Sequence, residues 1–115
     1  MADSVSRNSV DFSQIERVAA GDRALVLEVL ALFQGQAPLW AAALEPAADA
    51  EAWRNAAHSL KGSALAIGAG ALAEACDAAE IAAAVSPQAR QPLGERVKSA
   101  LAATLQETEA YCAGG

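Results

Sequence analysis

The chain carries near its centre the stretch His58-Ser59-Leu60-Lys61-Gly62-Ser63, which contains its single histidine. Apolar residues recur through and around this stretch at helical spacing, namely Trp53, Ala57, Leu60, Ala64 and Ile67. Each residue of an α-helix is turned about 100° from the last, so these five form one narrow apolar seam. The pattern predicts a helix from Ala50 to Ile67 that faces a hydrophobic core, with Asp49 as its N-cap and Gly68 at its end.

The histidine lies on the side of this predicted helix that faces away from the seam. Gly62 follows it one turn later on the same outward face, Lys61 flanks it, and Arg54 lies one turn before it. A glycine inside a helix costs about 1 kcal/mol relative to alanine, so its presence needs a reason. Leu65 also falls near this face, either as a docking contact or as an ordinary exposed apolar residue. The spacing predicts a solvent-exposed imidazole beside cations and bare backbone.

The composition indicates an all-α protein. Hydrophobic residues make up 54% of the chain but aromatic residues only 4%, because alanine, the best helix former, predominates. The predicted helices begin with a short one after Asp11, with Gln14 as its capping-box partner, and continue over 23–44, 50–67, 71–85 and 93–111. Short loops between them favour an antiparallel up-down four-helix bundle with a short N-terminal lead-in helix. Residues 1–10 are expected to form a flexible polar tail, and residues 11–113 a single domain.

The predicted helix over 23–44 raises a question about Gln36. We expect its apolar face to consist of Leu25, Val29, Leu32, Leu39 and Ala43. Gln36 falls on the same stripe, and burying an unpaired amide costs about 1–3 kcal/mol. Its partner is either His58 or backbone and water near the helix end. In the following helices, Cys76 is expected in the core, the acidic residues Glu74, Asp77 and Glu80 on a solvated face, and Pro87 and Pro92 in a loop.

Charge and residue counts exclude several classes of function. The net charge is −6 and the estimated isoelectric point about 4.6, which disfavours a nucleic-acid partner because phosphate binding needs a basic face. The two cysteines form no metal-binding spacing, so no metal site or cofactor is expected. No stretch reaches the roughly 18 apolar residues of a membrane span, and Met1 to Asn8 lack the apolar run of a signal peptide. We therefore expect a cytoplasmic protein with reduced thiols.

An exposed imidazole beside a cation suits phosphoryl transfer. Neutral imidazole is a good nucleophile, and its ordinary pKa near 6.5 leaves it mostly neutral at cell pH. It can attack the phosphorus of an acyl phosphate and later release the group. Lys61 would offset the charge of the phosphoryl group, and Gly62 would leave room for the partner. No acid–base pair or phosphate-binding loop is evident elsewhere, so the sequence predicts a recipient whose partner supplies the catalytic machinery and metal.

The stretch from Ala57 to Ala64, followed by Gly68-Ala69, Leu72, Cys76 and Glu80, resembles the histidine-containing phosphotransfer (HPt) domain of multistep phosphorelays. The resemblance extends more weakly from about Val10 to Tyr111, and Leu32-Phe33 and Gln36 look like that family's first long helix. It implies reversible phosphorylation of His58, with the phosphoryl group exchanged with aspartates of receiver domains in response regulators or hybrid histidine kinases. It also implies that Lys61 and Gly62 flank the phosphoacceptor and that Gln36 reaches toward the imidazole. Ala64 and Ala79 depart from the family's usual residues at positions that affect packing more than chemistry.

The main prediction is a monomeric phosphoryl carrier that is not itself an enzyme. The Mg²⁺ is expected to bind to the receiver domain of the partner. Two other functions compete with this prediction. One is a non-phosphorylated helical module that binds a receiver domain or kinase. The other is a fragment of a histidine kinase phosphoacceptor domain. Such kinase domains carry an acidic residue directly after the histidine, where this chain has Ser59, and 115 residues leave no room for an ATP-binding domain. Arg54 and Leu65 are the predicted docking residues.

Overall fold

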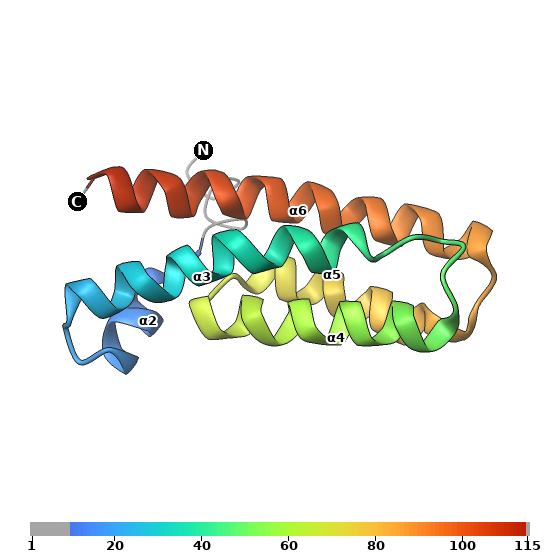
Figure 1. The fold of residues 1–115 in the computed structure, drawn as a ribbon, viewed down its shortest axis with the longest axis horizontal. Coiled ribbons are helices and arrows are strands. Elements are labelled where there is room, and N and C mark those ends of the chain that lie inside the picture. The colour runs from blue at the N-terminus through green and yellow to red at the C-terminus, as the bar shows by residue number, and fades with distance from the viewer. Residues whose placement is uncertain (1–9, 115) are drawn as a thin grey trace.

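The computed structural model describes residues 10–114 as five α-helices and one short 3-10 helix, with no strand in that part of the chain (Figure 1). The elements are α2 (Phe12–Val18), α3 (Arg23–Ala42), α4 (Ala50–Ile67), α5 (Gly70–Ile81), η1 (Ala82–Ala84) and α6 (Pro87–Gly114). The all-helical prediction is confirmed. The expected tail over 1–10 lies outside the described residues except for Val10, whose side chain is buried.

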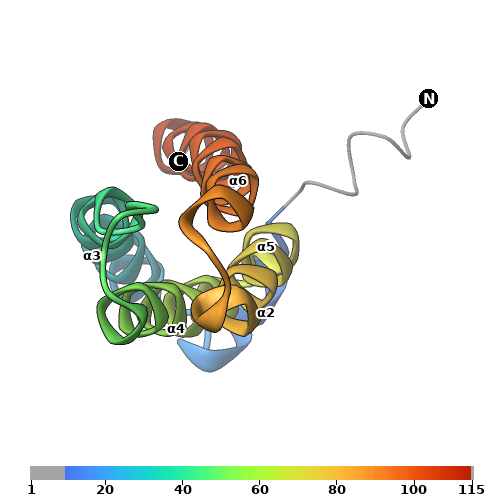
Figure 2. The same ribbon diagram turned by 90° about the vertical axis from the view of Figure 1, so that its right-hand side faces the viewer.

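The four long helices surround the core. Helix α3 packs against α4 and α6, and α5 packs against the same two helices, as Figure 2 shows end-on. The closest association is between α4 and α5, which carry the charged groups discussed below. Trp53 on α4 is fully buried, and its indole Nε1 donates a hydrogen bond of 2.5 Å to the carbonyl oxygen of Ala79 on α5. The buried indole of Trp53 and its hydrogen bond thus stabilise the packing of α4 against α5.

Helix α4 matches its prediction. All five residues of the seam are buried, from Trp53 to Ile67. Asp49 caps the start, where its carboxylate accepts a hydrogen bond of 2.7 Å from the backbone of Ala52. Gly68 ends the helix with φ at +83°, a left-handed conformation that favours glycine. A Cβ on Gly68 would also collide with the backbone of Asp11, so this position admits little but glycine.

The predicted apolar face of α3 was wrong. The buried residues of this helix are Val26, Leu30, Phe33, Ala37 and Ala41. The side chains of Leu25, Leu32 and Leu39 are instead 41%, 58% and 70% exposed. Helix α3 is apolar on nearly every side, so helical periodicity fits more than one stripe and cannot by itself select the buried one.

Helix α6 begins earlier than predicted. Pro87 and Pro92, expected in a loop, lie inside it. Proline is favoured in the first turn, since its missing N–H would have no helical partner there, but Pro92 costs one internal hydrogen bond. The buried side chain of Arg90 stabilises this helix start: its guanidinium donates hydrogen bonds to the carbonyls of Pro46, Ala48, Ala83 and Val85. Helix α5 is shorter than predicted, since η1 follows Ile81.

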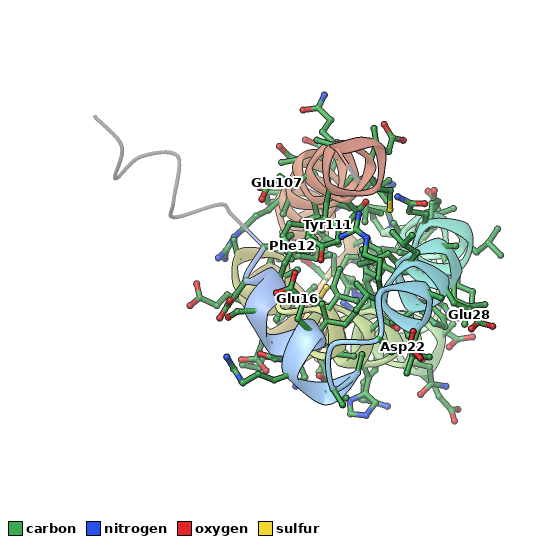
Figure 3. The ribbon with its side chains drawn as sticks, turned by 90° about the vertical axis from the view of Figure 1, so that its left-hand side faces the viewer. Phe12, Glu16, Asp22, Glu28, Glu107 and Tyr111 are labelled. Atoms are coloured by element: carbon green, nitrogen blue, oxygen red, sulfur yellow. The ribbon has the colours of Figure 1, made fainter. Side chains whose placement is uncertain are left out.

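The lead-in helix α2 is fastened to one end of the molecule. Phe12 stacks on Tyr111 of α6 with ring centroids 4.2 Å apart, and the Tyr111 hydroxyl donates a hydrogen bond to Glu16. Figure 3 shows these three side chains grouped where α2 meets α6. Asp11 caps α2 as predicted, but Gln14 does not complete a capping box. Its amide donates a hydrogen bond of 2.7 Å to the carbonyl of Leu65 instead, which satisfies a carbonyl in the last turn of α4.

Helix α3 is more apolar over its length than the sequence pattern indicated. It is the one helix in residues 10–114 with the length and apolar composition to cross a membrane, at a mean hydropathy of 1.3. Its buried row packs against the other helices, and a core helix can meet the same criterion. The composition of α3 is therefore weak evidence for a membrane span.

Candidate functional site

His58 points into solvent from the middle of α4. Its side chain is 69% exposed, and the apolar seam of the same helix is buried on the other side. The outward orientation predicted from periodicity is therefore confirmed. A partner protein can reach this imidazole without rearrangement of the core.

A carboxylate from the neighbouring helix holds one of the two ring nitrogens. Nδ1 of His58 lies 3.1 Å from Oε2 of Glu80 on α5. A carboxylate only accepts hydrogen bonds, so Nδ1 must be the donor in this contact. Neutral imidazole has one N–H and one lone pair. The pairing with Glu80 therefore leaves the lone pair on Nε2, on the side of the ring away from this contact.

Lys61 belongs to the same network. Its ammonium lies 3.1 Å from Oδ1 of Asp77 and 3.0 Å from Oε1 of Glu80. Hydrogen bonds to Glu80 and then Asp77 raise the pKa of Lys61 above its ordinary value. The bond from Lys61, followed by the contact with His58, lowers the pKa of Glu80. Oε1 of Glu80 is buried, so the ion pair with Lys61 compensates for its lost hydration. Lys61 and Glu80 therefore both stay charged at neutral pH.

The expectation that Glu74, Asp77 and Glu80 form a solvated face was wrong for Glu80. Glu74 and Asp77 are exposed, but the Glu80 side chain is only 22% exposed, and both Asp77 and Glu80 bind Lys61 of α4. Two carboxylates three residues apart share one helix face, and Glu80 stands in the stretch that resembles the HPt family. These two signals could have pointed to Glu80 in the sequence. They could not show that it contacts His58, because the packing of α5 on α4 decides which face of α5 lies toward α4.

The surface around the imidazole is open. Gly62 is exposed, and a Cβ placed on it would meet no atom of the described residues within 4 Å apart from its chain neighbours and the backbone of its own helix. Arg54 is exposed one turn before His58. Leu65 is exposed beyond Gly62 and lines a depression of 490 Å³ between α4 and α5, together with Lys61, Gly70, Ala73, Glu74 and Asp77. The predicted site residues of α4 thus share one accessible surface.

Gln36 is not on the buried face of α3, where it was expected. It lies on the exposed side of α3 together with Leu32 and Leu39. An exposed amide can bond to water, so the cost of burying an unpaired amide does not apply. The group that contacts His58 at hydrogen-bond distance is Glu80.

The interior below the site is apolar. Cys76, one turn before Glu80, is fully buried as predicted, and burial raises the pKa of its thiol to about 12. A thiol with such a pKa stays protonated and is a poor nucleophile at neutral pH. Within residues 10–114 no group of three or more His, Cys, Asp or Glu side chains is arranged to hold a metal ion. Cys76 therefore offers no accessible nucleophile beside His58.

Comparisons with known proteins agree on one family. Residues 27–111 match the Hpt domain. Among solved structures, the chain is similar to the histidine phosphotransferase ShpA from Caulobacter crescentus. The two are 42% identical, the alignment covers 91% of each chain, and the TM-score is 0.74. The search of curated proteins gives no match.

Proposed function

Because this chain belongs to the Hpt domain family and is a phosphotransfer intermediate of a phosphorelay, we propose that His58 is its phosphoacceptor and Nε2 the attacking atom. The observation that carries the proposal is the contact between Nδ1 and Glu80. It fixes the orientation of an exposed ring and assigns the lone pair to the nitrogen that faces away from the carboxylate.

The reaction follows from this arrangement. The lone pair of Nε2 attacks the phosphorus of a receiver domain's aspartyl phosphate, and the phosphorus–oxygen bond breaks with its electrons returning to the carboxylate. The phosphorylated ring keeps its proton on Nδ1 and carries a positive charge. The carboxylate of Glu80 lies 3.1 Å from Nδ1 and offsets that charge, as the aspartate of a Ser-His-Asp triad stabilises the imidazolium that forms there. In the reverse direction the same contact holds the ring for donation.

Lys61 and Gly62 have supporting roles in this proposal. Lys61 lies one turn from His58 and contributes positive charge near an incoming phosphoryl group. Gly62 keeps the surface beside the ring free of side-chain bulk. Gln36 would add a polar contact to the bound phosphoryl group or its donor from α3.

Hpt domains interact with receiver domains in phosphorelays, and we propose that the receiver docks over the outer surfaces of α3 and α4. Arg54 and Leu65 flank His58 along α4. Leu32 and Leu39 expose apolar surface on α3 beside Gln36. Exposed apolar side chains on a helix that packs against α4 suit a transient protein interface. Hpt domains are phosphoryl carriers rather than catalysts, so the Mg²⁺ and the catalytic carboxylates would belong to the receiver domain.

We also propose an arrangement and a setting for the molecule as a whole. The packing of α3 and α5 against both α4 and α6 supports an antiparallel up-down four-helix bundle, with α2 as lead-in helix. The burial of Val10 and the contacts of Phe12 with Tyr111 support a single domain over 11–113. Cys76 and Cys112 are free thiols, which fits a reducing, cytoplasmic compartment. We expect the protein to act as a monomer, so that each copy presents one His58.

The direct test is incubation with a receiver domain carrying labelled aspartyl phosphate. Label should appear on the wild-type protein and on a Glu95→Gln control, whose substitution lies on the exposed surface of α6. His58→Gln should acquire none while keeping its helical content. Labelled His58→Gln would overturn the assignment. Stable binding of the receiver without any label on the wild type would favour the interaction module instead.

A further inference from the structure

Lys61 is the cation nearest the phosphoacceptor along α4, yet two carboxylates already bind it. Its ammonium lies between Asp77, at 3.1 Å, and Glu80, at 3.0 Å. Glu80 also contacts His58, at 3.1 Å. Asp77, which binds Lys61 as well, lies on α5 one turn before Glu80. Asp77 is 54% exposed and has no part in orienting the ring.

The charges of Lys61, Asp77 and Glu80 determine how well the site can stabilise an added phosphoryl group. Two carboxylates surround one ammonium, so the cation is fully neutralised before phosphorylation. A phosphoryl group on Nε2 brings further negative charge, which Lys61 can offset only as far as it leaves its present partners. The ion pair with Asp77 therefore competes with stabilisation of the phosphorylated state.

We propose that Asp77 is a positioning residue that restrains Lys61 and so keeps the phosphohistidine of this protein a ready phosphoryl donor. The inference rests on the proposed role of His58 and deepens it. In the transfer that Asp77 favours, a carboxylate oxygen of the receiver attacks phosphorus and the phosphorus–nitrogen bond breaks. Its electron pair returns to Nε2, while the proton stays on Nδ1 beside Glu80. When Lys61 stabilises the phosphohistidine less, the equilibrium of phosphoryl transfer lies further toward the receiver aspartate.

Helix α5 offers a matched control. Glu74 lies on the same helix one turn before Asp77, is exposed, and is absent from the ion pairs that hold Lys61. Glu74→Gln removes the same charge as Asp77→Asn at a similar place on the surface. A variant that restores the carboxylate, Asp77→Glu, tests whether the ion pair itself is the relevant feature.

The experiment measures the equilibrium between labelled His58 and a receiver aspartate, together with the half-life of isolated phosphohistidine. Asp77→Asn should shift the equilibrium toward His58 and lengthen the half-life by about two- to fivefold, as expected for release of one exposed ion pair. Glu74→Gln and Asp77→Glu should remain within error of the wild type. Circular dichroism on each variant confirms that the helices are retained.

A double-variant cycle identifies the route of the effect. If Asp77 acts through Lys61, then Asp77→Asn should have no effect in a Lys61→Met background. An equal effect with and without Lys61 would show direct repulsion by the Asp77 charge and overturn the proposal, as would wild-type behaviour of Asp77→Asn or an equal effect of Glu74→Gln. Failure of the wild type to be labelled, or label on His58→Gln, would instead refute the proposed function.

Discussion

Glu80 on α5 binds Nδ1 of His58 through one carboxylate oxygen, at 3.1 Å, and Lys61 through the other, at 3.0 Å. One side chain from a neighbouring helix thus organises both the imidazole and the cation next to it. The geometry of the site depends on how α4 and α5 pack, and the buried Trp53 with its hydrogen bond to Ala79 fixes that packing.

Substitutions of Glu80 should separate orientation from charge. Glu80→Gln retains an oxygen that accepts from Nδ1 but loses the negative charge, so transfer should slow modestly. Glu80→Ala loses both and should slow transfer by about two- to tenfold, the equivalent of one hydrogen bond. Single-turnover transfer from a labelled receiver domain measures both rates. A wild-type rate for Glu80→Ala would show that the contact does not help to position His58.

The same pairing predicts how stability depends on pH. Bonding to Lys61 lowers the pKa of Glu80 below its ordinary 4.5, so its contribution is complete above that value and is lost as pH falls through the lower folded-state pKa. The pKa of Lys61 is raised above 10.5, so its contribution persists below that value and is lost at higher pH. Glu80→Gln should therefore be less stable than the wild type at neutral pH, with the gap narrowing in acid.

Urea unfolding at neutral pH and well below pH 4.5 measures this gap. A gap between wild type and Glu80→Gln that stays constant across that range would mean that ionised Glu80 contributes nothing to folding. Asp77→Asn gives a second comparison. Because the Asp77 side chain is more exposed, we expect a smaller difference in the free energy of unfolding between this variant and the wild type at neutral pH.

Gly62 should tolerate substitution for folding but not for docking. Gly62→Ala should stabilise the helix by up to about 1 kcal/mol, because alanine has the higher helix propensity and a Cβ at this position meets open space. Gly62→Leu should also fold, but its side chain would project one turn from His58 and obstruct the receiver. Thermal melting and transfer rates measured on the same variants test both expectations. If Gly62→Leu transfers at the wild-type rate, the glycine does not provide access.

Two leucines of α3 should behave in opposite ways. Leu30 is fully buried and Leu32 is 58% exposed. Leu30→Ala should destabilise the protein by about 2–5 kcal/mol through lost burial and a cavity. Leu32→Ala should change stability by about 0.5 kcal/mol or less but weaken binding of the receiver. Urea unfolding and titration with a receiver domain measure these effects, and unimpaired binding by Leu32→Ala would exclude that part of α3 from the interface.

The contrast between α4 and α3 shows what sequence periodicity can and cannot predict. Helix α4 has charged and polar residues on its outer side, so only one face can be buried, and both its bounds and the exposure of His58 were predicted correctly. Helix α3 has leucines on two faces, so the pattern could not distinguish the row containing Leu30 from the row containing Leu32. Only contact with α4 and α6 decides between them.

Other differences also arise from contacts that are distant in sequence. Pro87 and Pro92 suggest a loop by local rules, but the buried guanidinium of Arg90 donates hydrogen bonds to carbonyls of two segments, 46–48 and 83–85, and supports a helix there. Glu80 lies 22 residues from His58 in the chain, and its role depends on the rotation of α5 about its own axis. The outward position of His58 could be predicted from its own helix, whereas its contact with Glu80 could not.

The most direct test of the central claim is to locate the phosphoryl group on the labelled protein by nuclear magnetic resonance. Proton–nitrogen–phosphorus correlations distinguish the two ring nitrogens of a phosphohistidine. We predict a single phosphorylated site at Nε2 of His58, with Nδ1 still protonated beside Glu80. A phosphoryl group on Nδ1, or on any residue other than His58, would contradict the account.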